Sequence, residues 1–197
     1  LFADGKSRGI QLQNMPRKYK DLIGPRDLNN LIGEVDGSQI EFRVAAFVGA
    51  DTKAKDNIRR GVDQHIFTAR TLAGLTLEEY TELSPKKRKQ LRQAAKADTF
   101  KPLYGGQRGT PAQERYYKAF REEFPDLAQT QEDWTYEVLR TGSLRMPWGM
   151  EFHWPGVKQT PDGYITNTPS IYNYPIQNLA TGEIVPTALT FLYYRAK

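Results

Sequence analysis

Two serine/threonine–proline pairs constrain the fold of this chain more than any other feature of the sequence. They stand at residues 84–85 and 110–111, and each joins a capping hydroxyl to a proline in the first turn of a helix. The first pair predicts a helix from residue 85 to about 100 or 103. The second predicts an amphipathic helix that Pro125 stops. Two helices with fixed starting points therefore dominate the middle of the chain.

The rest of the sequence reads as further short helices with little strand. Ile40, Val44 and Phe47 recur at i, i+4 and i+7, which indicates one apolar helix face after a short strand that begins at Val35 and delivers Asp36. Thr76 is a candidate cap for the helix that follows it. The expected elements are loops over 1–33, helices over 50–60, 63–72, 77–83, 132–140 and 180–196, and a hairpin over 148–166 around the turn at 160–163. The predicted fold class is α/β of the α+β kind, mostly helical.

Composition excludes several kinds of site. The chain has 197 residues, 39% of them hydrophobic, which is enough for a packed core. It has no cysteine and two histidines, His65 and His153, so disulfides and thiolate zinc sites are excluded. No apolar run reaches the roughly 18 residues that a membrane helix needs, so we expect no membrane partner and a cytoplasmic protein. The net charge of +5 and the pI of 9.3 are compatible with a nucleic-acid partner.

One helix face combines cations with aromatic rings. Arg92, Lys96 and Phe100 are four residues apart, and Tyr104 follows just past the predicted helix end. Cations that bind phosphate oxygens beside rings that contact a sugar and a base would suit a nucleoside triphosphate. The alternative is a solvated basic helix whose aromatic side chains lie in the core.

A second candidate site lies in residues 35 to 43, VDGSQIEFR. A carboxylate at a strand end beside a tight glycine, here Asp36 and Gly37, can hold a hard divalent cation such as Mg²⁺. The alternative is an ordinary aspartate at a turn. A single carboxylate is also a poor site for two-metal phosphoryl transfer, which needs at least two.

These segments together resemble the family A DNA polymerases, the DNA polymerase I family. Residues 12 to 17 (LQNMPR) resemble the family's LQN-x-P-R segment, and residues 35 to 43 resemble motif A. Residues 63 to 69 match D-x-H-x-x-T-A, and the series Arg92, Lys96, Phe100 and Tyr104 matches motif B. Asn173 to Ala180 is similar to N-x-P-x-Q-x-x-A of the palm. The resemblance runs in order over nearly the whole chain, and residues 165–189 look most like bacteriophage members.

The resemblance implies a nucleotide site. His65, Arg92 and Lys96 would hold the triphosphate of a dNTP, and Lys96 would also be a general acid for the pyrophosphate. The family places Glu41 under the sugar as a steric gate. The remaining implied contacts are Gln39 to the dNTP, Phe100 to the ribose and Tyr104 to the templating position. Outside this context, His65 would be read as a histidine at the edge of the core.

The resemblance also implies metals, DNA and a division of the chain. Asp36 and the Gly37 carbonyl would bind Mg²⁺, two ions being present in the intact active site, while Asn173 and Gln177 would contact the primer-template. Residues 1–48 would be part of the palm, 49–147 the fingers helices with motif B, and 148–197 a hairpin and return to the palm. If the chain is phage-encoded, it would work in the cytoplasm of a bacterial host during DNA replication.

The expected function is template-directed DNA polymerisation. The family's motif C, which supplies the second metal-binding aspartate, would follow residue 197 in the same or another chain, so we expect the isolated chain to be inactive without it. One alternative is a single-subunit RNA polymerase or reverse transcriptase, against which Glu41 and Phe100 argue. Another is a non-catalytic nucleic-acid-binding or split-polymerase subunit.

Two departures from the family pattern carry further expectations. Pro102 lies within motif B, two residues after Phe100, where the family usually has an apolar residue, so the helix should end or kink there. The basic run at 86–89 (KKRK) precedes motif B, and we expect it to be a solvated face.

Overall fold

The chain divides into two compact units, which we describe separately: Leu1–Gly37 and Ser38–Lys197. In the first unit the element described is the 3-10 helix η2 (Arg17–Leu22), on which Leu22 is exposed. The predicted strand at Val35 and the metal-ligand candidate Asp36 lie outside the described residues, as do residues 12–16. The computed structural model describes residues 17–27, 29, 37–161 and 163–195.

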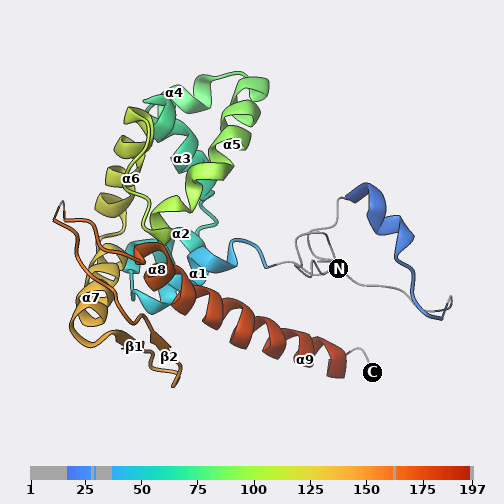
Figure 1. Cartoon of the computed structure of the whole chain (residues 1–197). Helices are drawn as coiled ribbons and strands as arrows, with labels where there is room; N and C mark the ends of the chain where they lie inside the picture. The colour runs from blue at the N-terminus through green and yellow to red at the C-terminus, as the bar shows by residue number, and fades with distance from the viewer. Residues whose placement is uncertain (1–16, 28, 30–36, 162, 196–197) are drawn as a thin grey trace, which may run out of the picture. The chain divides into compact units, whose positions relative to one another are not determined.

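The second unit is mostly helical with one small sheet, as predicted (Figure 1). Helices α3 to α6 stand together as one group, and the β1–β2 hairpin lies near the end of α7 (Figure 1). The elements are α1 (Ile40–Val48), α2 (Thr52–Arg59), α3 (Gln64–Ala73), α4 (Leu77–Glu82), α5 (Pro85–Thr99), the 3-10 helix η3 (Lys101–Tyr104), α6 (Pro111–Glu123), α7 (Pro125–Thr141), β1 (Ser143–Arg145), β2 (Glu151–His153), α8 (Thr168–Gln177), the π-helical stretch η4 (Asn178–Ile184) and α9 (Val185–Arg195).

Side-chain caps fix the starts of the helices in the first group. Thr76 and Thr110 each form a capping box with the residue three positions later, and Ser84 accepts a hydrogen bond from the Lys87 N–H. The predicted starts of α4, α5 and α6 are therefore confirmed. Helix α5 ends at Thr99, and Pro102 lies in the tighter turn of η3, as its missing N–H requires.

The side of α1 that faces the core differs from the prediction by one residue row of the helix surface. Phe47 is 70% exposed, whereas Phe42, Ala45 and Ala46 are buried together with Val44. The buried residues at i, i+3 and i+4 form the true core stripe. The Ile40–Val44–Phe47 series describes a neighbouring stripe that only partly faces the core.

Two elements differ from the sequence prediction because of proline. Pro125 ends α6 as predicted, but it is also the first residue of α7, so that helix starts well before residue 132. Helix α8 was not predicted, and it contains two prolines, Pro169 and Pro175. The first proline lies in the opening turn and the second inside the helix. The chain is helical from 178 to 195, as η4 followed by α9.

The predicted hairpin is only partly correct. The paired strands are β1 and β2, which are antiparallel with Leu144 opposite Phe152. Around the predicted turn, a single antiparallel bridge joins Gln159 and Ile165, and the Thr160 N–H donates to the Tyr164 carbonyl at 2.7 Å. The sequence pattern therefore located the second turn and missed the first strand of the sheet.

Phe124 lies at the centre of the main core. It is fully buried and contacts Phe42 at 5.3 Å and Phe120 at 4.9 Å between ring centroids. The rings pack edge to face, the arrangement that aromatic quadrupoles favour. This cluster joins α1 and α6 to α7, and buried Ile171 and Ile176 on α8 belong to the same core.

A smaller cluster fixes α5 against its neighbours. Ala69 of α3, Tyr80 of α4 and Ala95 of α5 are buried together, and the Tyr80 hydroxyl donates to the Arg88 carbonyl at 3.1 Å. This packing determines which side of α5 faces outward.

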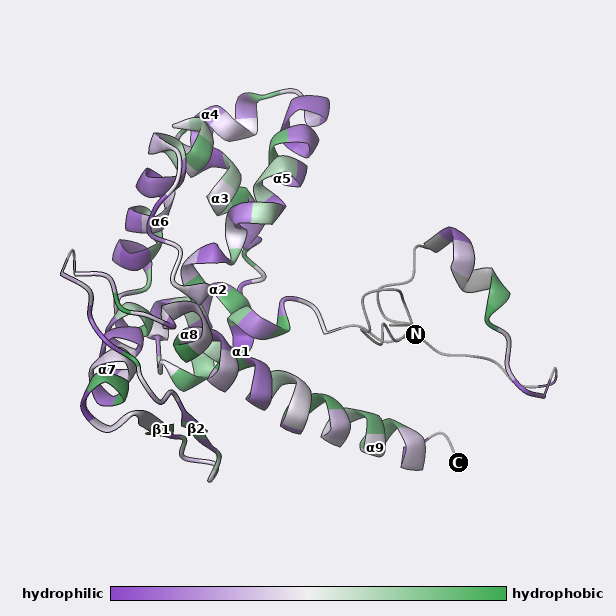
Figure 2. Cartoon of the chain, viewed as in Figure 1, coloured by the Kyte–Doolittle hydropathy of each residue, from purple (hydrophilic) through white to green (hydrophobic). Residues whose placement is uncertain are grey.

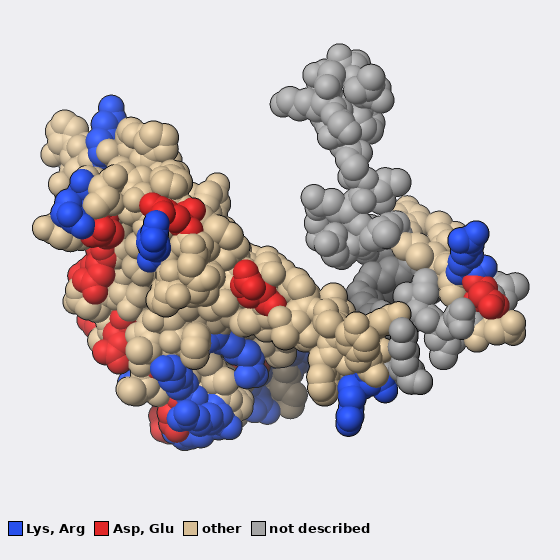
Figure 3. Space-filling view, turned by 90° about the horizontal axis from the view of Figure 1, so that it is seen from below, with Lys and Arg blue, Asp and Glu red and all other residues tan. Residues whose placement is uncertain are grey.

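Figure 2 shows that apolar residues are not confined to the core, since they also run along α9. No residue of α9 is buried. Within the described part of the chain, no helix has both the length and the apolar character needed to cross a membrane. On the face drawn in Figure 3, the largest group of Lys and Arg lies at the lower edge of the unit with an acidic residue among them, and basic and acidic residues alternate at the upper left.

Candidate functional site

The predicted cations lie on α5 where it packs against α3. Arg92 is half-buried and Lys96 is exposed. Phe100 is the C-cap of the helix. The structure therefore brings Arg92, Lys96 and Phe100 onto one side of α5, next to the start of α3 that carries His65.

An ion pair joins the two helices at this point. The Arg92 Nε lies 2.7 Å from the Asp63 Oδ2, and the Asp63 Oδ1 accepts the His65 N–H at 2.9 Å. Asp63 therefore caps α3 and holds Arg92 with its other oxygen. Asp63 had no predicted role in the site. Its position before a helix signals a cap, but nothing local signals a partner 29 residues away.

The two terminal nitrogens of Arg92 take no part in the ion pair with Asp63. Within the described residues, only Nε of its guanidinium makes a hydrogen bond or an ion pair. A guanidinium has five N–H donors in a fixed fork. The terminal nitrogens are thus available to an anionic ligand while Asp63 holds the group in position.

The hydrogen bonds of His65 define its tautomer. The Thr99 hydroxyl donates to the Ala95 carbonyl at 2.9 Å, so it accepts from the His65 Nδ1–H, also at 2.9 Å. The Nε2 atom is left as the titrating nitrogen. The His65 ring lies 5.6 Å from the Phe100 ring, edge to face.

Burial lowers the pKa of His65 from its ordinary value of 6.5, and Arg92 and Lys96 lower it further, while Asp63 acts in the opposite direction. The His65 ring therefore lies beside two cations, which disfavour its protonation. A bound anion would offset those cations and favour protonation at Nε2.

We expect Lys96→Gln to raise the pKa of His65, because the substitution removes one of the cations that lower it. Asp63→Asn should lower the pKa instead, since it removes the opposing carboxylate. An NMR titration of the His65 ring protons, assigned with a His65→Gln variant, measures both.

The lowered pKa of His65 also predicts that the free energy of unfolding falls as pH decreases below 6.5, because the unfolded state takes up the proton more readily. A His65 pKa that is unchanged in both variants would contradict this electrostatic account.

A second group of predicted residues meets where α1, η3 and α8 converge. The Gln177 Nε2 lies 3.5 Å from the Glu41 Oε1 and 3.4 Å from the Tyr104 hydroxyl. Burial raises the pKa of Tyr104, and the nearby Glu41 carboxylate adds to the effect. The phenol is therefore a neutral donor at physiological pH. Both hydrogen bonds are long, so the three polar ends are adjacent without being tightly bound.

Phe100 connects the two groups. Its ring stacks on Phe42 at 6.5 Å between centroids, with the planes 28° apart, and Phe42 directly follows Glu41. The described site therefore runs from Arg92 and His65, past Phe100, to Glu41 and the residues around it.

Asn173 and Gln39 lie at the edges of this arrangement. Asn173 precedes Gln177 by one turn of α8, and its Oδ1 atom is buried without a hydrogen-bond partner among the described residues. Gln39 is the N-cap of α1 in a left-handed conformation, with φ of 51°. Such strain in a non-glycine residue is uncommon and is concentrated at functional sites.

The predicted metal ligands are not assembled in the described chain. Asp36 lies outside the described residues, and Gly37 is the last residue of the other unit. Among residues 17–27, 29, 37–161 and 163–195, no three His, Cys, Asp or Glu side chains cluster as a metal site would require. The described residues alone do not make a magnesium site.

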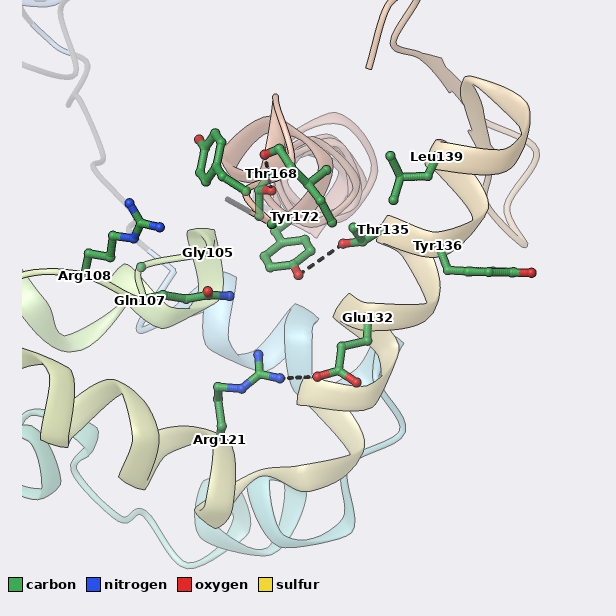
Figure 4. A pocket seen from close by; sticks show the side chains of 14 residues that line it. Gly105, Gln107, Arg108, Arg121, Glu132, Thr135, Tyr136, Leu139, Thr168 and Tyr172 are labelled. Atoms are coloured by element: carbon green, nitrogen blue, oxygen red, sulfur yellow. Dashed lines mark hydrogen bonds and ion pairs between the residues drawn. The ribbon is translucent and has the colours of Figure 1, made fainter. Parts of the chain in front are cut away.

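A cavity of about 700 Å³ was not predicted from the sequence. Figure 4 shows it between α7, α8 and the loop after η3, with Arg121 paired to Glu132 on one wall. The Thr135 hydroxyl donates to the Tyr172 hydroxyl at 3.1 Å on another. None of the predicted site residues lines this cavity, although its wall at Gly105 directly follows Tyr104.

The chain is similar in sequence to curated DNA polymerase I proteins, although no family model matches it. It is 34% identical to DNA polymerase I of Geobacillus stearothermophilus over 113 residues, which cover 53% of this chain and 12% of that protein. The identity is 34% over 94 residues with the Aquifex aeolicus enzyme, or 48% of this chain and 15% of that one. With DNA polymerase I of Bacillus caldotenax the identity is 35% over 100 residues, which cover 48% of this chain and 11% of that protein. The matches thus span about an eighth of the length of these relatives.

A solved structure shares the fold. The POL domain of Pol1 from M. smegmatis, in complex with DNA primer-template and dNTP, superposes with a TM-score of 0.53 at 21% identity. The match covers 71% of this chain and 25% of that one. With the ordered motifs and the three relatives, the chain is similar to a fragment of the DNA polymerase I family, the family A DNA polymerases, and it shares part of the polymerase-domain fold.

Proposed function

We propose that the chain provides the nucleotide-binding face of a template-directed DNA polymerase, which transfers nucleotides from dNTPs to a primer 3′ end. The convergence of Arg92, Lys96 and His65 beside Phe100, with Glu41 beyond it, is the observation that carries the proposal. The solved relative with primer-template and dNTP supports the same assignment.

The cationic end suits the triphosphate. Arg92 offers its terminal nitrogens, Lys96 a mobile ammonium, and His65 an Nε2 that gains a proton as negative charge arrives. Charge-assisted hydrogen bonds of this kind are the strong ones. Lys96 is exposed on the same side of α5 and is our candidate for the general acid that protonates the leaving pyrophosphate.

The other end suits the sugar and the base pair. Phe100 would pack on the ribose, with Glu41 beneath it and Gln39 at the edge of the pocket. Tyr104 would close over the templating position, with Asn173 and Gln177 against the primer-template. The buried Asn173 Oδ1, which has no hydrogen-bond partner among the residues that the structure describes, is the kind of acceptor that a ligand donor would satisfy.

Glu41→Ala is expected to raise the use of rNTPs relative to dNTPs, because the carboxylate would no longer fill the space that a 2′ hydroxyl needs. Single-nucleotide incorporation in the complete polymerase, with dNTP and rNTP compared as kcat/KM ratios, measures the change. Arg43→Ala, on the exposed side of the same helix, serves as the control. A wild-type protein that already prefers rNTPs would favour the RNA polymerase alternative.

The metal part of the proposal rests on Asp36 and the Gly37 carbonyl. These groups would hold Mg²⁺, which when bound activates the primer hydroxyl and neutralises the triphosphate. The described residues do not complete such a site. The cytoplasm is the proposed site of action, where a DNA polymerase meets its template.

Primer extension tests the proposed function. The chain would be assayed alone and with a downstream palm segment of the family added, with Mg²⁺, all four dNTPs and an Asp36→Ala control. We expect Asp36-dependent extension once the segment is present. Binding of DNA and dNTP without any extension would instead identify a non-catalytic or split subunit. Extension by the chain alone that Asp36→Ala abolishes would show that a second carboxylate lies within these residues.

A further inference from the structure

The first turns of α5 carry a run of basic residues that does not stabilise the helix. Lys86, Lys87 and Lys89 are exposed and Arg88 is half-buried, while the first turn contains no acidic residue. Cations near a helix N-terminus oppose the helix dipole. Helix stability therefore gives no reason for the run, whose polar surface Figure 2 shows at the start of α5.

Two of these lysines continue the face that carries the candidate phosphate cations. Lys89 precedes Arg92 by three residues and Lys96 by seven, so the three share one face of the helix. Lys86 precedes Lys89 by another three residues. At 1.5 Å per residue, the face spans about 15 Å from Lys86 to Lys96. Lys87 precedes Lys89 by two residues and so points about 160° away from it, on the other side of the helix.

The packing of α5 keeps this face toward solvent. Leu91 and Ala95 lie on its inner side in the small cluster with Tyr80, and the Tyr80 hydroxyl anchors the helix at the Arg88 carbonyl. Helix α4 is acidic, but across the described chain none of its glutamates forms an ion pair with Lys86 or Lys89. Arg92 is paired with Asp63, so the charges of Lys86, Lys89 and Lys96 are the ones on this face that remain without an ion pair among the described residues.

We propose that Lys86 and Lys89 form an outer docking patch that captures the triphosphate of an incoming nucleotide before Arg92 and Lys96 hold it. This inference rests on the proposed function, because it assumes that the phosphates lie at the Arg92 end and the sugar at Phe100. The direction of the nucleotide along α5 follows from the order of these residues. Phe100 lies at the C-terminal end of the face, and the cations continue from it toward the N-terminal end.

The face fits a nucleoside triphosphate better than a nucleic-acid strand. Surfaces that track single strands combine cations with aromatic side chains on which the bases stack. Between Lys86 and Lys96, α5 contains no aromatic residue. The face has a short row of cations that ends at the single ring of Phe100. This arrangement fits one nucleotide, with its base and sugar at the ring and its phosphates along the cations.

Charges at the rim of a site act on the association rate more than on the dissociation rate. The double variant Lys86→Gln/Lys89→Gln should therefore lower the association rate constant of a nucleoside triphosphate by about three- to tenfold at low salt. The dissociation rate should stay unchanged. At about 1 M salt, where the screening length is only about 3 Å, the difference from wild type should disappear.

Stopped-flow fluorescence with mant-dATP on the full chain tests the proposal. The matched control is Lys87→Gln/Lys118→Gln, which removes the same charge from the other side of α5 and from exposed Lys118 on α6. The control should keep the wild-type rate within about twofold, because distant charges act only through net charge. An unchanged rate in Lys86→Gln/Lys89→Gln, or an equal loss in the control, would overturn the proposal.

Two further arms separate the sources of failure. If wild-type protein binds mant-dATP and mant-deoxyadenosine equally, the phosphate site itself is absent and the proposed function fails. If the Lys86→Gln/Lys89→Gln variant weakens binding of a single-stranded oligonucleotide but leaves mant-dATP association unchanged, the face serves nucleic acid and the docking patch is wrong.

Discussion

Replacing Arg92 with alanine is expected to weaken dNTP binding by about 10- to 150-fold. Hydrogen bonds to charged groups contribute about 1.5–3 kcal/mol each, and 1.4 kcal/mol corresponds to a factor of ten in affinity. The loss should be at the upper end, because the variant also leaves the Asp63 carboxylate, now unpaired, close to the triphosphate. Isothermal titration of the chain with dATP measures the change.

Two matched variants separate charge from geometry in this prediction. Arg92→Lys keeps the charge but loses the planar fork, so its affinity should be intermediate. Asp63→Asn keeps a helix cap, since asparagine caps as well as aspartate, and removes a negative charge beside the site. Its dATP affinity should equal or exceed that of the wild type. An Arg92→Ala protein that is folded by circular dichroism and binds dATP as the wild type does would exclude Arg92 from the site.

Phe124→Ala should lower the free energy of unfolding by about 3–5 kcal/mol, the usual cost of truncating a buried phenylalanine. Phe124 is fully buried and joins α1 and α6 to α7 through Phe42 and Phe120. The loss removes these ring contacts and leaves a cavity that the surrounding helices can only partly fill. Urea unfolding followed by circular dichroism measures the difference.

Phe47→Ala is the matched control, because it is the same substitution at a site that is 70% exposed. Its effect should stay within about 0.5 kcal/mol, as for most surface changes. A large effect at Phe47 with a small one at Phe124 would restore the helix face expected from the sequence and contradict the packing described above.

Local signals in the sequence were sufficient for the helix starts. Thr76, Ser84 and Thr110 act through hydrogen bonds to residues three positions later, so their role depends on little beyond the neighbouring sequence. The end of α5 before Pro102 is local for the same reason. The spacing of Arg92, Lys96 and Phe100 also needs only the helix period.

Features that depend on distant partners could not be predicted in this way. Contact between Phe42 and Phe124, far along the chain, determines which side of α1 faces the core. The sequence pattern placed Phe47 on that side, whereas the structure leaves it exposed. Helix α8 contains Pro175, which local propensity opposes and tertiary packing of Ile171 and Ile176 overrides. The Asp63–Arg92 pair and the Gln177 contacts join residues 29, 73 and 136 positions apart.

The central claim is that the Arg92 end of the site recognises phosphate. Isothermal titration of the wild-type chain with dATP, dAMP and deoxyadenosine at low salt tests it most directly. We predict that affinity falls with each step of phosphate removal, and that added salt weakens dATP binding while leaving deoxyadenosine unaffected. Equal affinities for all three ligands, independent of salt, would contradict the account.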